Sequence, residues 1–312
     1  MENQQQMLQS EISRFGRVAV LMGGISAERE VSLRSGQAVC NALVAAGVDA
    51  AAIDVQSLDD VLSLKGAFDR VFVALHGRWG EDGVVQAMLN DMQMPFTGSD
   101  MASCALGMDK LRCKWLWLGV GLPTPKFQWI TPNHPVDYSH FSIPFPVMVK
   151  PSHEGSSIGI SKADNLDELK AAVIEAQKFD SEVLIEQWVE GDEYTCAILD
   201  GQALPMIKLE TDHDFYDFSA KYQSNDTQYI CPCGLSESAE AVVQQIALQA
   251  FNAVGLKDWG RVDFMIDGNN QPWLIEINTI PGMTDHSLVP MAAKQSGLSF
   301  QALVMKILAT SL

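Results

Sequence analysis

The sequence predicts an α/β fold that begins with a doubly wound parallel sheet and continues into further mixed domains. Its 312 residues suit two or three domains. In the first third, short apolar runs alternate with amphipathic helical segments, which is typical of parallel sheets. In the last third, two apolar runs flank a Gly/Asn turn, which is the pattern of a β-hairpin. An apolar content of 47% and a charged content of 19% favour ordered cores over disorder.

Composition excludes several classes of function. A net charge of −18 gives no reason to expect a nucleic acid or an anionic membrane as partner. No apolar run approaches the ~18 residues of a membrane span, and the polar segment 1–14 reads as a frayed leader without a signal-peptide core. The six cysteines are scattered through apolar segments, so no disulfide framework is expected, and Cys231-Pro232-Cys233 has no partner pair for zinc. We therefore expect a cytoplasmic protein.

The first third contains three predicted parallel strands. They span residues 17–22, 50–55 and 71–75. A helix between the first two places Val39, Leu43 and Val44 inward and ends at Gly47, and another helix covers 84–89.

Two polar residues lie where the carboxyl ends of these strands meet, which is where ligands bind in such sheets. Glu28 follows Gly23-Gly24 and suits a ligand ammonium, but it could instead only stabilise the dipole of the following helix. His76, before Gly77, lines the same crevice and could equally be a satisfied structural histidine. The glycine pair is not a dinucleotide motif.

The middle third carries a candidate phosphate site. A predicted helix over 99–118 contains Lys110, and the predicted strand 146–151 ends beside Lys150. The loop that follows contains Ser156 and Ser157; small residues let backbone N–H groups approach an anion while the lysine supplies charge. The loop is not a Walker A motif, and a flexible turn is the alternative.

Further groups suited to a nucleotide follow. A predicted strand over 182–189 ends with Glu186 and Trp188, whose backbone could read an adenine edge, although ordinary packing would also explain the tryptophan. Glu193 could accept hydrogen bonds from ribose hydroxyls. The long polar segment 210–229, with Lys221 and Tyr222, is expected to form a lid.

The hairpin near the carboxyl terminus is the strongest signal. Arg261 and Asp263 are two apart on the first strand, and Glu276 and Asn278 are two apart on the second. Residues two apart share a face of a strand. The paired strands therefore collect two carboxylates and an amide oxygen, the ligands that Mg²⁺ prefers, beside an arginine. A solvated face with a salt bridge is the alternative.

Several segments together resemble the D-alanine–D-alanine ligase family of the ATP-grasp superfamily. The resemblance covers nearly the whole chain from about residue 17. It rests on Gly24-x-Ser26-Ala27-Glu28-Arg29-Glu30-Val31-Ser32, Ala74-Leu75-His76-Gly77, Met108-Asp109-Lys110, Lys150-Pro151-Ser152 with Glu154-Gly155-Ser156-Ser157, Ala220-Lys221-Tyr222, and Glu276-x-Asn278-Thr279-x-Pro281-Gly282-Met283-Thr284.

The resemblance implies an N-terminal α/β domain over 1–101 and a two-domain, α+β ATP-grasp fold. Its central subdomain would span 102–190 and its C-terminal subdomain 191–312, with the lid at about 210–229. It implies ATP-dependent ligation of two D-alanine molecules through an acyl phosphate, releasing ADP and phosphate, for peptidoglycan precursor synthesis.

The resemblance also implies a role for each candidate residue. Asp263, Glu276 and Asn278 would hold two Mg²⁺, with Mn²⁺ as an alternative. Lys110, Lys150 and Lys221 would hold the phosphates, with Ser157, Glu186, Trp188, Glu193 and Asn278 completing the nucleotide site. Arg261 and the Gly282 backbone N–H would stabilise the tetrahedral oxyanion.

The two amino-acid sites would be built from the remaining residues. Glu28 would bind the first alanine's ammonium, His76 would line the same site, and Ser287 would bind the second alanine's carboxylate. Glu28, Ser156 and Tyr222 would link the three domains, and Tyr222 favours D-alanine over D-lactate as second substrate.

Two alternatives remain, and a homodimer is expected from the family. Another ATP-grasp ligase would keep the metal ligands and lysines but lack the set of Glu28, Ser156 and Tyr222. A non-catalytic ATP-binding scaffold would have lost a metal carboxylate or Arg261, and the sequence retains them all.

Overall fold

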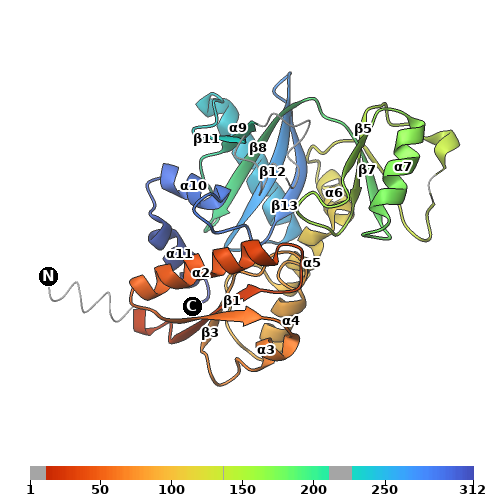
Figure 1. Ribbon diagram of the computed structural model, residues 1–312. Coiled ribbons are helices and arrows are strands. Elements are labelled where there is room, and N and C mark those ends of the chain that lie inside the picture. The colour runs from red at the N-terminus through yellow and green to blue at the C-terminus, as the bar shows by residue number, and fades with distance from the viewer. Residues whose placement is uncertain (1–11, 136, 211–226) are drawn as a thin grey trace.

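The computed structural model describes residues 12–135, 137–210 and 227–312. Three sheets, each with its own helices, form three parts that meet around a common centre (Figure 1). Within the described residues, no helix is both long and apolar enough to cross a membrane.

The N-terminal sheet is parallel, as the strand–helix alternation predicts. Its strand order is β2-β1-β3, and Figure 1 shows α2 on one side with α3 and α4 on the other. The elements are β1 (Arg17–Gly23), α2 (Arg29–Ala45), β2 (Asp49–Val55), α3 (Leu58–Leu62), β3 (Arg70–Val73) and α4 (Val84–Asp91).

One inward position in α2 was predicted wrongly. Val39 and Leu43 are fully buried, but Val44 is 55% exposed. Val39 and Leu43 are four apart and lie on one face of the helix, whereas Val44 lies one residue, about 100° of rotation, further round.

The helical segment after α4 is two helices rather than one. α5 (Met101–Met108) and α6 (Lys110–Gly119) are separated at Asp109, which has extended backbone angles. The Asp109 side chain accepts a hydrogen bond from the Arg112 N–H at 2.9 Å and thus caps α6. This break makes Lys110 the first residue of α6.

The central sheet is antiparallel, in the order β4-β7-β5-β6, and α7 packs on it. Its elements are β4 (Phe127–Ile130), the 3-10 turn η1 (Tyr138–His140), β5 (Val147–Pro151), β6 (Ser161–Ala163), α7 (Leu166–Ala176) and β7 (Val183–Gln187).

The C-terminal sheet has the order β11-β10-β8-β12-β13, with β9 beside β8. Its elements and the helices that follow are β8 (Gly191–Leu199), β9 (Gln202–Ala203), β10 (Ile207–Glu210), β11 (Gln228–Ile230), α9 (Glu237–Val254), β12 (Trp259–Asp267), β13 (Pro272–Asn278), α10 (Leu288–Gln295) and α11 (Phe300–Ala309). The predicted hairpin is thus confirmed.

Two cores cover the two faces of this sheet. On one face, α6 and α9 bury Trp117 and Phe251. On the other, Trp259 joins the N-terminal sheet and helices α10 and α11 in one continuous core. The chain's C-terminal end is also fixed to the N-terminal sheet, because the buried Arg70 donates to the backbone carbonyl of Ser311. The α/β class with an N-terminal parallel sheet is confirmed, while the exact domain boundaries remain a prediction.

Candidate active site

The hairpin of β12 and β13 brings its polar residues directly opposite one another. Asp263 pairs with Glu276, and Arg261 pairs with Asn278. The turn that sets this register is held by Asp267, whose carboxylate accepts two backbone N–H bonds within the turn. The sheet therefore presents two carboxylates, an amide and a guanidinium on one patch.

Asp263 accepts hydrogen bonds from three side chains around it. Arg261 donates to both of its oxygens, from Nε at 2.8 Å and from Nη2 at 2.7 Å. Thr195 on β8 donates to it at 2.6 Å, and Asn278 Nδ2 at 3.0 Å. Two parallel hydrogen bonds hold the planar guanidinium of Arg261 and the planar carboxylate of Asp263 in a fixed relative orientation. Arg261 therefore has one orientation at the cavity wall.

Lys110 connects the hairpin to the serine-rich loop. Its Nζ donates to the Glu154 carbonyl at 2.7 Å and lies 3.4 Å from Glu276 Oε2. Its backbone N–H donates to the Ser152 carbonyl at 3.1 Å. A cation therefore already stands beside the candidate metal carboxylate.

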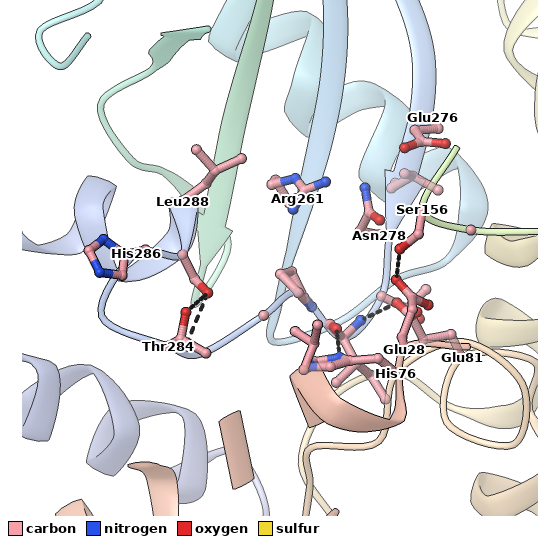
Figure 2. Close-up of a pocket in the computed structure, with 18 of the residues that line it drawn as sticks. Glu28, His76, Glu81, Ser156, Arg261, Glu276, Asn278, Thr284, His286 and Leu288 are labelled. Atoms are coloured by element: carbon pink, nitrogen blue, oxygen red, sulfur yellow. Dashed lines mark hydrogen bonds between the residues drawn. The ribbon is translucent and has the colours of Figure 1, made fainter. Parts of the chain in front are cut away.

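The serine loop, residues 152–159, reaches across to the N-terminal domain. Ser156 Oγ donates a hydrogen bond to Glu28 Oε1, drawn in Figure 2. Ser156 and Ser157 have φ of 51° and 59°, in the left-handed region that non-glycine residues seldom adopt. Such strain persists where the surrounding structure enforces it, as it does in many functional loops.

A partly buried ion-pair network anchors the base of this loop. His153 lies 2.7 Å from Asp180 through Nδ1 and 3.1 Å from Asp109 through Nε2. Hydrogen bonds to Asp109 and Asp180 raise the pKa of His153 to about 9. Arg112 pairs with Asp109 and with Glu182 in the same cluster. The cluster already holds two cations, so we interpret it as structural rather than as a metal centre.

Glu81, which the sequence analysis did not single out, lies beside Glu28. Its carboxylate accepts the N–H groups of Gly77 at 2.8 Å and Ile280 at 3.1 Å. Burial, reinforced by the Glu28 charge, raises the pKa of Glu81 to about 8. Glu81 therefore joins the strand-end loop after β3 to the loop after β13.

His76 is buried and both of its ring nitrogens have partners. Nδ1 lies 2.9 Å from the Ile280 carbonyl and Nε2 lies 3.1 Å from Ser35 Oγ. Burial lowers the pKa of His76 and favours the neutral ring. The carbonyl can only accept, so the proton lies on Nδ1 and Ser35 donates to Nε2. These bonds favour the structural alternative, although His76 also lines the cavity.

The loop after β13 folds on itself at Ser287. Its Oγ accepts the Thr284 N–H at 2.9 Å and lies 2.8 Å from Thr284 Oγ1. A Cβ on Gly282 would lie 2.9 Å from this oxygen. Only glycine therefore lets the backbone pass this close to Ser287.

These groups surround one cavity of about 680 Å³, a size typical of a small-molecule site. Figure 2 shows residues from all three parts of the chain pointing toward it. The predicted site residues that line it are Glu28, His76, Lys110, Ser156, Arg261, Glu276, Asn278, Gly282 and Ser287.

Asp263, Lys150 and Trp188 do not line this cavity, and Asp263 is 6% exposed. Lys150 forms a buried ion pair with Glu186. Trp188 lines a second hollow of about 560 Å³, where Lys162 Nζ lies 4.7 Å from its ring centre. The Trp188 backbone N–H already donates to the Pro146 carbonyl at 3.2 Å.

Two of the remaining predicted residues lie in the described part of the chain, and two do not. Glu193 lies on β8 opposite Met265, and Ser157 lies in the serine loop. Lys221 and Tyr222 lie outside the described residues, as does most of the predicted lid.

Sequence reasoning missed several residues in and around the site, among them Glu81, which lines the cavity, Thr195, which donates to Asp263, and Lys114, which pairs with Glu186. Lys114 had a signal, because it lies four residues after Lys110 and so close to the same helix face. Glu81 and Thr195 lie near the motifs, but no spacing pattern in the sequence identifies either of them as a site residue.

The chain matches two family models, D-ala D-ala ligase N-terminus over residues 56–99 and D-ala D-ala ligase C-terminus over residues 116–309. It is 62% identical over 301 residues to a D-alanine–D-alanine ligase of Hydrogenovibrio crunogenus, covering 96% of each chain. The chain belongs to the D-alanine–D-alanine ligase family.

Solved structures agree with this assignment. A D-alanine–D-alanine ligase of Bacillus anthracis complexed with ATP has a TM-score of 0.85 and 30% identity, covering 95% of this chain and 97% of that one. A D-Ala:D-Ser ligase of Enterococcus faecalis has a TM-score of 0.83 and 28% identity, with 95% and 99% covered. These family matches confirm the predicted two-domain ATP-grasp fold after the N-terminal α/β domain.

Proposed function

We propose that this protein joins two D-alanine molecules to D-alanyl-D-alanine, with ATP converted to ADP and phosphate, for peptidoglycan precursor synthesis. One observation supports the proposal: a single cavity collects the carboxylate of Glu28, which suits an ammonium, the guanidinium of Arg261 and the oxygens of Glu276 and Asn278, which suit a hard cation. A non-catalytic scaffold would be expected to have lost a metal carboxylate or Arg261, and the chain retains Asp263, Glu276 and Arg261.

The first half-reaction needs a carboxylate, a phosphoryl group and charge neutralisation. The carboxylate oxygen of the first alanine attacks the γ-phosphorus, and ADP leaves with its bond electrons. Lys110, Lys150 and, from outside the described residues, Lys221 would hold the phosphates, with Ser157, Glu186, Trp188 and Glu193 around the rest of the nucleotide. Lys110 is well placed for this role because it bridges the hairpin and the serine loop.

Asp263, Glu276 and Asn278 would hold two Mg²⁺, or Mn²⁺ in their place. Their donor set fits, because it consists of two carboxylates and an amide oxygen on adjacent strands. Each carboxylate already pairs with a cation, Glu276 with Lys110 and Asp263 with Arg261, which supports the binding of positive charge at this patch. Bound Mg²⁺ would neutralise charge on the phosphates.

The second half-reaction forms the peptide bond. The amine of the second alanine attacks the acyl carbonyl, phosphate leaves, and the amine loses a proton. Arg261 and the Gly282 N–H would stabilise the oxyanion of the tetrahedral intermediate. Ser287, already accepting from the Thr284 N–H, would donate its hydroxyl proton to the second alanine's carboxylate.

The first alanine's ammonium would bind Glu28, which the serine loop holds in place through Ser156. Tyr222 would complete this link from the lid, which would cover the cavity and exclude water from the acyl phosphate. We extend the proposal to the domain boundaries 1–101, 102–190 and 191–312, to a homodimer and to a cytoplasmic location, where ATP is available.

The test is ADP release by purified protein with ATP, Mg²⁺ and D-alanine, with L-alanine, D-serine and D-lactate run in parallel and products identified by mass. We expect ADP and D-alanyl-D-alanine with D-alanine alone. Turnover only with a different second substrate would refute the second-site assignment and retain the mechanism. Nucleotide binding without turnover on any substrate would refute the enzymatic proposal.

A further inference from the structure

Lys114 is a buried cation with no role in the reaction as described above. Its side chain is 1% exposed. Its Nζ donates to Thr124 Oγ1 at 2.7 Å and to the Leu274 carbonyl at 3.3 Å, and it forms an ion pair with Glu186. Thr124 Oγ1 in turn donates to the Leu274 carbonyl at 2.9 Å. Lys114 therefore ties α6 to β13 and to β7 at once.

Glu186 lies between two lysines. Lys114 pairs with Oε1 and Lys150 pairs with Oε2, and the carboxylate itself is 2% exposed. Burial opposes the charge on Glu186, but Lys114 and Lys150 outweigh it and lower its pKa. Burial lowers the pKa of Lys114, and the Glu186 charge opposes that effect, so the ion pair favours the charged lysine. With both lysines charged, this site has a net charge of about +1 near the cleft.

The two lysines differ in their access to a ligand. The Lys150 side chain is 9% exposed and that of Lys114 is 1% exposed. Lys150 also lies at the end of β5, directly before the serine loop. If Lys114 were absent, Glu186 would be left with Lys150 alone, in a site where weak screening makes such pairs strong. The charge of Lys150 would then be cancelled by Glu186.

We propose that Lys114 is a positioning residue for the nucleotide: it neutralises Glu186 from within the core, so that Lys150 keeps its charge for the phosphates. The proposal rests on the assignment of Lys150 to the phosphates above. It differs from a purely structural role, because the function of Lys114 depends on the charge of Glu186. Removing that charge should remove the need for Lys114.

The test compares the wild type, Lys114→Met, Glu186→Gln and the double variant in steady-state kinetics. Methionine has nearly the length of lysine but no charge. We expect Lys114→Met to raise the KM for ATP about tenfold, the loss of roughly one charge-assisted contact. The KM for D-alanine should stay unchanged and kcat should change less than the KM for ATP. Lys178→Met, which removes an exposed lysine paired with Glu175, is the control and should match the wild type.

The double variant provides the decisive readout. In the Glu186→Gln background, adding Lys114→Met should change the KM for ATP by no more than about twofold. A tenfold effect in that background would overturn the proposal, as would an unchanged KM for ATP in folded Lys114→Met. Equal losses in the KM values for ATP and D-alanine would also overturn it, because they indicate a general loss of structure.

Two outcomes need separate handling. If Lys114→Met does not fold, the comparison of Glu186→Gln with the double variant still tests the proposal. Neither of these two variants has a buried carboxylate at position 186 that Lys114 would have to neutralise. If the wild type shows no ligase activity, the proposed function fails, and calorimetric titration with ATP tests Lys114 independently, with the same order of affinities expected.

Discussion

His153 gives the protein a stability that depends on pH. The side chain bridges Asp109 and Asp180 at 3.1 and 2.7 Å and so fastens the serine loop to the start of α6 and to the turn before β7. Replacing it with glutamine, which carries no charge at any pH, removes the titrating group. The charged groups around it are those two aspartates, Arg112 and Glu182.

The magnitude follows from the raised pKa. A folded-state pKa of about 9 against an ordinary 6.5 corresponds to about 3 kcal/mol for a fully enclosed group. The side chain is 34% exposed, so solvent screening reduces this to roughly 1.5 kcal/mol. Because the pKa is raised in the folded state, this stabilisation is fully present below pH 6.5 and is lost as the pH rises through 9.

The assay is thermal unfolding of the wild type and His153→Gln between pH 6 and 10. At pH 6 the variant should melt about 3 °C lower, and the pH-dependent part of the difference should disappear by pH 10. His140→Gln is the matched control, since His140 pairs with Asp137 in solvent, with its side chain 85% exposed. A difference that stays constant or grows with pH would refute the assignment.

Three further predictions concern the site and the fold. Glu276→Ala should lower turnover by about 10³-fold with an unchanged circular dichroism spectrum, because it removes a proposed metal ligand; full activity would contradict that role. Ser156→Ala should lower kcat/KM for D-alanine about 10–100-fold, since Glu28 loses a charge-assisted donor, and an unchanged value would contradict the link. Arg70→Met should lower the free energy of unfolding by about 2–4 kcal/mol in urea titrations, because buried carbonyls at Phe15 and Ser311 lose their donor. Its KM values at 25 °C should match the wild type, and an unchanged urea midpoint would refute the role of Arg70.

The sequence by itself determined the elements whose signals are local. The alternation of strands and helices gave the parallel sheet, and the two-residue spacing of Arg261 with Asp263 and of Glu276 with Asn278 gave the polar patch on the hairpin. Backbone geometry fixes these relations, because side chains two apart in a strand share a face whatever else surrounds them. The motifs in order were also enough to identify the family.

Only the tertiary structure decided which distant groups meet. The bond from Ser156 to Glu28 spans 128 positions, and the contact of Glu81 with Ile280 spans 199. The ion pair of Lys114 with Glu186 likewise joins residues that are far apart in the sequence. The packing of the three sheets determines which of these residues contact one another. A local sequence pattern does not specify which surface of another part of the chain will lie against it.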